Sequence, residues 1–157
     1  MSSVWRPDDS VLQRDQNGVL DGVRRVQDAL RKNDVRFANR VITSQDKGMQ
    51  AAQRDLKRTG SPAGVEQWIM PIVFGPKDKE ILCFVSVMEP GAKVPAHSHG
   101  QGHFRIVIEG SVKYGGVELN PGDWMSVPEG ALYALEAGPK GCRILYWHPM
   151  ARHEGVE

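Results

Sequence analysis

The stretch "GAKVPAHSHGQGHFRIVIEG", residues 91–110, decides how this chain is interpreted. It contains three of the five histidines, His97, His99 and His103, in the pattern H-x-H-x-x-x-H. Alternate side chains of a β-strand point to the same face, so His97 and His99 should project together. The loop at residues 100–102 can then reverse the chain, so that His103 begins the next strand beside them. The pattern predicts that three imidazoles can converge on one ion.

Neutral imidazole is a common metal ligand, and three such ligands leave coordination positions open for a reactive centre. We therefore expect a divalent transition metal, with Fe(II) favoured and Zn, Ni, Cu or Mn as the alternatives. The opposing interpretation is that these histidines lie on a surface loop or hydrogen-bond to the backbone. The spacing of the three histidines favours the metal site.

The length and composition are those of one globular domain. The 157 residues are 40% hydrophobic and 25% charged, which suits a chain that folds around its own core. Twenty basic and nineteen acidic residues give a formal net charge of +1 without a long Lys/Arg run, so we expect no nucleic-acid partner. Neither a membrane span nor a secretory signal is recognisable in the sequence. We therefore expect a cytoplasmic protein with no membrane partner.

The two cysteines, Cys83 and Cys142, lie within apolar, strand-like runs and form no C-x-x-C pair. Free cysteines are among the most buried residue types. We therefore expect two buried free thiols rather than a disulfide or a redox site.

The first third of the chain has helical patterns. Apolar residues recur at steps of four, three and four at Val19, Val23, Val26 and Leu30. This stripe predicts an amphipathic helix within residues 17–34. A second helix is expected within residues 43–62, where Gly48 is a weak point and Pro62 a stop. Residues 34–42, between the two helices, are either a short strand or an extended connection.

From residue 65 onward the chain changes to short apolar runs separated by turn residues. The runs are VEQWIMPIVF, ILCFVSVM, FRIVIEG, SVKYGGVEL, DWMSVP, ALYALEA and CRILYWH. Short strands at such regular spacing are typical of a sandwich or barrel. We therefore expect residues 1–64 to form a helical extension that packs on the outside of a β-barrel formed by residues 65–157.

The histidine stretch resembles the first motif of the cupin superfamily, in which Gly, His-x-His, Glu and Gly follow one another at set spacings. Gly91, His97, His99 and Gly110 match that motif. His103 stands where cupins usually have the glutamate. The substitution removes a negative charge from the ligand set, which would favour an anionic substrate or a phenolate as a further ligand.

The second cupin motif is similar to "GDWMSVPEGALY", residues 122–133. Gly122, Pro128 and Gly130 match it, and Tyr133 stands where the last histidine is usual. The resemblance covers residues 80–148. It implies a mainly β fold, a double-stranded β-helix (cupin or jelly-roll) barrel with N-terminal helices, and a metal inside the mouth of the barrel.

Two further residues are candidates for catalysis. Arg105 shares a strand face with His103, and its guanidinium fits a carboxylate or phosphate. That anion is either a substrate group or a structural partner such as Glu109 or Glu136. Tyr133 is either a metal ligand, a proton donor or base, or a core aromatic residue.

The remaining histidines and the aromatic residues have separate expected roles. His148 is a further ligand candidate, although Pro149 after it indicates the end of a strand. His153 lies in a polar tail, where we expect it to be solvated. Packing of the barrel is the expected role of Phe104, Trp124, Tyr146 and Trp147.

Three functions are consistent with these residues. The leading one is a metal-dependent dioxygenase that acts on a small oxygenated organic substrate, with an anionic group as one option. The second is a redox-neutral lyase, isomerase or cyclase that uses the same ion as a Lewis acid. The third is a non-catalytic cupin that binds a metal or a small ligand. We also expect a homodimer.

Overall fold

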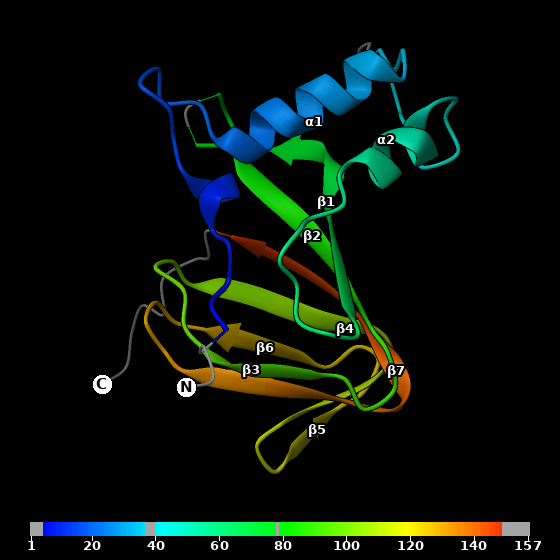
Figure 1. Cartoon of the computed structure of the whole chain (residues 1–157). Helices are drawn as coiled ribbons and strands as arrows, with labels where there is room; N and C mark the ends of the chain where they lie inside the picture. Colours follow the sequence, from blue (N-terminus) through cyan, green and yellow to red (C-terminus); the bar gives the residue numbers. More distant parts are fainter. Residues whose placement is uncertain (1–4, 37–39, 78, 149–157) are drawn as a thin grey trace.

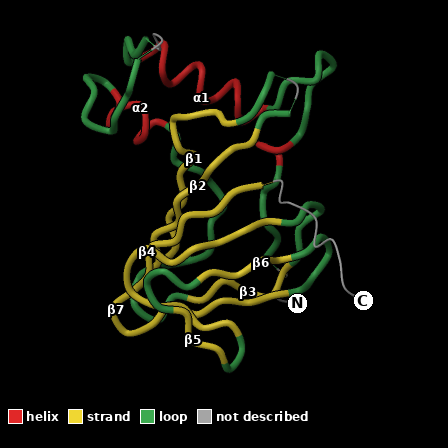
Figure 2. The backbone as a smooth tube through the Cα atoms, turned by 180° about the vertical axis from the view of Figure 1, so that it is seen from behind, coloured by secondary structure: helices red, strands yellow, loops and turns green. Residues whose placement is uncertain are grey.

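The computed structural model describes residues 5–36, 40–77 and 79–148. Strands form a curled body, and two helices lie together at one end of it, over the ends of β1 and β2 (Figure 1). Figure 2 shows the same arrangement from behind, with the helices in red and the strands in yellow. The predicted fold class, a mainly β barrel with N-terminal helices, is confirmed.

The helical elements precede all the strands. They are the 3-10 helix η1 (Ser10–Leu12) and the helices α1 (Asp21–Lys32) and α2 (Met49–Asp55). Helix α1 forms where the apolar stripe predicts it, and it buries Val23 and Val26. Helix α2 begins later than expected because Gly48, at its N-terminal boundary, has a φ of 83° that excludes it from the helix. It also ends at Asp55, before the expected stop at Pro62. Residues 34–36 and 40–42 form no strand, and residues 37–39 lie outside the described ranges.

Seven strands follow. They are β1 (Val65–Phe74), β2 (Ile81–Met88), β3 (Lys93–His97), β4 (His103–Tyr114), β5 (Val117–Leu119), β6 (Trp124–Val127) and β7 (Tyr133–His148). All the pairings are antiparallel, and the order across the sheet is β1-β2-β7-β4-β5, with β3 paired to β7 and β6 paired to β4. Strand β7 therefore contacts three other strands, and it joins two runs that the sequence analysis separates.

Strands β4 and β7 pair irregularly near Gly110 of β4. Gly110 has a φ of 70° and pairs with Cys142, and the register shifts between Gly110 and Val112. A Cβ at Gly110 would meet the carbonyl oxygen of Gly141 on β7. The close approach of these two backbones lets both strands bend together, and only glycine fits at this position.

Two groups of buried apolar residues fill the molecule. In the first, α1 and α2 pack against β1 and β2 through residues such as Val26, Ile69 and Phe84. The second fills the barrel, with Val107, Leu135 and Ile144 among its members. The boundary expected between residues 64 and 65 stays a prediction. In the described part of the chain, neither helix has the length and apolar character that crossing a membrane requires.

Candidate metal centre

The ends of three strands bring the candidate residues together at one end of the barrel. His97 is the last residue of β3, His99 follows two residues later, and His103 is the first residue of β4. Tyr133 begins β7 and pairs with His97. His148 ends β7 and pairs with Leu82 of β2. The alternation of strand residues and the tight loop therefore gather histidines from separate parts of the chain.

Four imidazoles form one cluster. The ring centres of His97 and His99 are 5.0 Å apart, and those of His99 and His103 are 4.9 Å apart. His148 joins the cluster at 4.6 Å from His103 and 5.1 Å from His99. The H-x-H-x-x-x-H pattern predicts three of these residues as ligands, His148 is the further candidate, and the structure packs all four together.

The Tyr133 hydroxyl lies between the histidines and Arg105. It is 2.9 Å from Nε2 of His97 and 3.2 Å from Nε2 of His99. Nη2 of Arg105 donates a hydrogen bond of 2.9 Å to it. Tyr133 is buried, so this oxygen is held by three nitrogens in a water-poor site.

The other ring nitrogen of His97 and of His99 faces an acceptor. Nδ1 of His97 lies 2.7 Å from the carbonyl oxygen of Pro95, and Nδ1 of His99 lies 3.0 Å from the Asp9 carboxylate. Each Nδ1 therefore carries a proton, and in the neutral rings both Nε2 atoms present lone pairs to Tyr133. The single phenolic proton can satisfy only one of them. The other lone pair is left for a cation or a further hydrogen-bond donor.

Several buried nitrogens near this point have no hydrogen-bond partner. Among the described residues they include both ring nitrogens of His103, Nδ1 of His148 and Nε of Arg105. His103 is fully buried and His148 is 2% exposed. Buried polar atoms are rarely left unsatisfied, and a group of such atoms indicates a bound water or ion.

Burial holds His97, His103 and His148 in their neutral form. It lowers the pKa of His97 to about 4 and that of His148 to about 3, and neighbouring positive groups, Arg105 among them, act in the same direction. The pKa of His103 is lowered for the same reasons. Neutral imidazole has the lone pair that a metal ligand needs, so the electrostatic environment suits ligation.

Asp9 is the acidic group of the cluster. Burial acts to raise the pKa of Asp9, but the hydrogen bond from His99 and the nearby positive charges outweigh it and lower the pKa. The carboxylate is therefore ionised at neutral pH. A carboxylate that orients a histidine from its far nitrogen is a common support of metal ligands.

Arg105 is 6% exposed and has no ion-pair partner among the described residues. Its guanidinium lies over the ring of Tyr146, 4.2 Å from the centre. Glu109, one of the acids considered as a structural partner, lies 3.4 Å from Arg143 instead. A buried arginine without a carboxylate is free to hold an anion that enters from outside.

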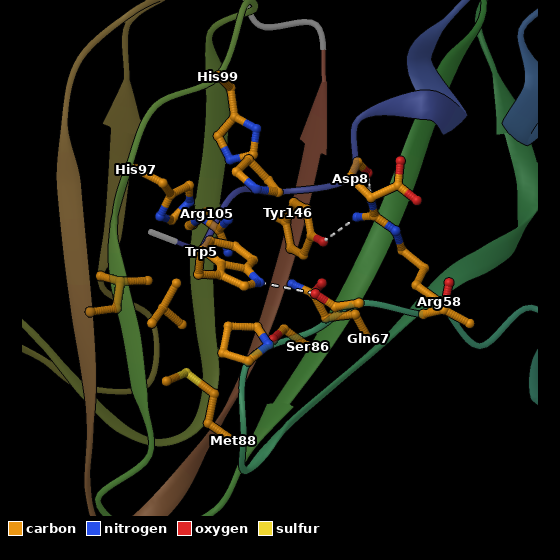
Figure 3. Close-up of a pocket in the computed structure, with 16 residues that line it drawn as sticks. Trp5, Asp8, Arg58, Gln67, Ser86, Met88, His97, His99, Arg105 and Tyr146 are labelled. Carbon is orange, nitrogen blue, oxygen red and sulfur yellow. Dashed lines mark hydrogen bonds between the residues drawn. The ribbon is translucent and has the colours of Figure 1, made fainter. Parts of the chain in front are cut away.

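A small cavity of about 20 Å³ adjoins the cluster (Figure 3). Trp5 packs edge-on against His97, with ring centres 4.8 Å apart, and its indole N–H donates to the carbonyl oxygen of Gly60. Arg58 lies across the cavity, donating to the Tyr146 hydroxyl at 3.1 Å and to the backbone oxygen of Asp8. The N-terminal segment therefore closes the cavity on one side.

The residues present fit a metal ion in chemistry, although they are not arranged around one. In the described part of the chain, no three histidine, cysteine or acidic side chains stand in a ready ligand arrangement. The Tyr133 oxygen lies between the Nε2 atoms of His97 and His99. The neutral rings, the unpartnered nitrogens and the carboxylate behind His99 nevertheless form a donor set suited to a divalent transition metal.

The aromatic residues differ in their roles. Tyr146 is buried, as expected of a packing residue, and Phe104 contacts Trp147 at 4.7 Å between ring centres. Trp124 does not follow the expectation, because it is 60% exposed and stacks on Phe104. The prediction for His153 concerns a residue outside the described ranges.

Comparison with known proteins gives matches in structure alone. No protein-family model matches the chain, and no curated protein matches it. The polyketide cyclase RemF from Streptomyces resistomycificus is 21% identical, with a TM-score of 0.51 over 75% of this chain and 83% of that one. An RmlC-like cupin from Shewanella frigidimarina is 19% identical, with a TM-score of 0.49 over 74% of this chain and 95% of that one.

A chain in the complex of Rhodobacter sphaeroides SigE with the anti-sigma ChrR is 22% identical, with a TM-score of 0.49 over 58% of this chain. The match covers 48% of that chain, so this chain spans about half its length. The likeness to RemF is a likeness in fold alone. The antiparallel strands of this chain form the cupin-like β-barrel that its two sequence motifs imply.

Proposed function

We propose that this protein is a metal-dependent cupin enzyme that acts on a small, anionic, oxygenated organic substrate, with dioxygenation as the leading reaction. The observation that carries the proposal is the buried histidine cluster with unpartnered nitrogens, next to Arg105, which has no carboxylate partner within the described ranges. Proteins of this fold include a polyketide cyclase and an oxalate decarboxylase, so the fold alone does not select the reaction.

The metal would be held within the histidine cluster, for which the sequence predicts His97, His99 and His103 as ligands. A bound divalent ion, with Fe(II) favoured, would supply open positions where substrate and dioxygen can meet. Imidazole ligands carry no charge to offset that of the ion. An anionic substrate is therefore favoured as a partner of the site.

Arg105 and Tyr133 would handle the substrate. The Arg105 guanidinium would hold the anionic group through charged hydrogen bonds and fix the orientation of the substrate. The Tyr133 hydroxyl, which receives a hydrogen bond from Arg105 and faces Nε2 of His97, would give or take a proton. Trp5 and Arg58, which line the cavity, would help to exclude water from the site.

The position of Tyr133 favours a second candidate, a redox-neutral lyase, isomerase or cyclase. Its hydroxyl is hydrogen-bonded on both sides, and burial raises its pKa despite the opposing effect of Arg105. The phenol therefore stays protonated at neutral pH and is suited to donate a proton to a developing oxyanion. A reaction of this kind would need no dioxygen.

Elemental analysis and oxygen uptake would separate these candidates. The protein would be purified without added metal, its metal content measured, and oxygen consumption recorded with diketones, phenols and small carboxylates. Iron with substrate-dependent oxygen uptake would support the dioxygenase. Substrate loss without uptake would support the redox-neutral enzyme. The absence of bound metal after reconstitution with Fe(II), Zn(II) or Ni(II) would contradict both.

A further inference from the structure

His148 is the one cluster histidine that neither cupin motif contains. It is the last residue of β7, 45 positions after His103, and the strand pairing of β7 with β2 brings it into the cluster. It is 2% exposed, and its Nδ1 atom has no hydrogen-bond partner among the described residues. The ring is therefore buried with one nitrogen that no described residue satisfies.

The rings of His99, His103 and His148 are mutually close. Their centres are 4.9, 4.6 and 5.1 Å apart, which makes a nearly equilateral triangle. An ion about 2.1 Å from an imidazole nitrogen lies about 3.2 Å from the ring centre, so two rings on one ion at angles of about 90–110° stand about 4.5–5.2 Å apart. All three ring separations fall within that range, although the nitrogens of these rings are not yet turned to one point.

The space between His97 and the Tyr133 hydroxyl is less suited to an ion. There the Tyr133 oxygen lies between His97 and His99, and the positive guanidinium of Arg105 is hydrogen-bonded to it. A cation there would have to displace the phenol and approach the guanidinium. Among the described residues, His103 and His148 offer unpartnered nitrogens instead. An ion beside them would take the single lone pair of His99, on Nε2, from its 3.2 Å contact with the phenol, and the phenol would keep its 2.9 Å contact with His97.

Packing does not account for a histidine at this position. The His148 ring meets Phe84 and Tyr146 edge-on, with ring centres 6.1 and 6.0 Å away. A phenylalanine would fill the same space among these aromatic rings without burying an unsatisfied nitrogen. The polar ring is therefore better explained by a ligand than by the hydrophobic core.

We infer that His148 is a metal ligand and that it holds the ion together with His99 and His103. The inference rests on the proposed function, and it changes the role of His97. With its Nε2 atom against the Tyr133 hydroxyl, His97 becomes the proton partner of the phenol rather than a required ligand.

Metal affinity of the full chain tests this assignment without any substrate. Zn(II) binding would be measured by calorimetry, and the visible absorption of the Co(II) form recorded, for the wild type, His148→Phe, His103→Phe and His97→Phe. Both His148→Phe and His103→Phe should lose more affinity than the roughly 10–100-fold that follows loss of a supporting residue. Both of these variants should also change the Co(II) spectrum. The loss of affinity in His97→Phe should not exceed that range of roughly 10–100-fold.

The possible failures are distinguishable. A wild type that binds neither Zn(II) nor Co(II) would overturn the proposed function and this inference together. A His148→Phe variant with wild-type affinity and an unchanged Co(II) spectrum would overturn only the inference. If the variant does not fold, NMR of the wild-type ring nitrogens decides. A His148 ¹⁵N resonance that shifts on Zn(II) addition as those of His99 and His103 do supports ligation, and one that does not move refutes it.

Discussion

The carboxylate of Asp9 lies 3.0 Å from Nδ1 of His99, a residue 90 positions further along the chain. This contact connects the segment before η1 to the histidine cluster. It leaves the Nε2 lone pair of His99 facing the interior of the site, because the proton of the ring is held on Nδ1 by the carboxylate. Asp9 therefore sets both the tautomer and the orientation of a central member of the cluster.

Asp9→Asn should lower metal affinity by roughly 10–100-fold, the usual effect of changing a residue that supports a ligand. The amide can present either an oxygen or an NH₂ group to Nδ1, so the tautomer of His99 is no longer enforced. Calorimetric titration with Zn(II) would measure the change. Asp8→Asn is the matched control, because the Asp8 side chain accepts from the backbone N–H of Ser10 rather than from a histidine. Equal affinities for both variants would contradict the role given to Asp9.

Tyr133→Phe should preserve metal content while turnover falls by roughly 10²–10⁴-fold, the usual range for loss of a general acid or base. The ring would still pack beside His97, but no proton could pass from this position. Elemental analysis, steady-state kinetics and thermal unfolding would be measured on the same preparation. A folded variant with full activity would show that Tyr133 only packs the site.

Arg105→Leu should weaken binding of the anionic substrate by roughly 1.5–3 kcal/mol, the value of a hydrogen bond to a charged group. Arg105→Lys keeps the charge but loses the forked geometry, so its KM should lie between those of the wild type and the leucine variant. The KM of the compound found by the oxygen-uptake panel is the readout. Unchanged KM in both variants would exclude a substrate role.

Cys83 and Cys142 should resist alkylation in the native protein. Both are buried free thiols, as expected from the sequence, and burial raises the pKa of each to about 11. At pH 8 the thiolate fraction is therefore small, and the reagent also has poor access. Mass spectrometry after iodoacetamide treatment should show little labelling in buffer and double labelling in denaturant. Fast native labelling would contradict the packing of β2 and β7.

Gly110→Ala should lower the free energy of unfolding by at least about 1–3 kcal/mol, because alanine is strained at positive φ and its Cβ would meet the Gly141 carbonyl. Gly116→Ala is the control, since a Cβ at Gly116 has no neighbour within 4 Å and its φ is not positive. Chemical denaturation of both variants measures the difference. Equal stabilities would indicate that β4 can bend without the glycine.

The fold was largely predictable because local sequence patterns determine most of its helices and strands. The stripe of α1 and the apolar runs of β1 and β2 are regular over one element each, and the structure places those elements close to the expected residues. The extent of α2 was not predictable in the same way. Gly48 at positive φ moves its start to Met49, and the helix also ends at Asp55, well before the stop expected at Pro62.

The site was predictable only in part. His97, His99 and His103 lie within seven residues, so their proximity follows from one strand, one loop and one reversal. Asp9 and His148 reach the same cluster through contacts between distant parts of the chain, which no local pattern records. The ligand set and the catalytic roles stay predictions, which the variants described above would test.

Strand β7 carries Tyr133 at its first residue and His148 at its last, and it pairs with β2, β3 and β4, all of which come earlier in the chain. A ribosome releases the chain from its N-terminus, so these partners emerge with their β7-facing edges still open. The barrel closes only when β7 has emerged. The same step brings Tyr133 and His148 next to the three cluster histidines that were synthesised earlier. During synthesis, therefore, a nascent chain acquires its complete histidine cluster no earlier than it acquires its closed barrel.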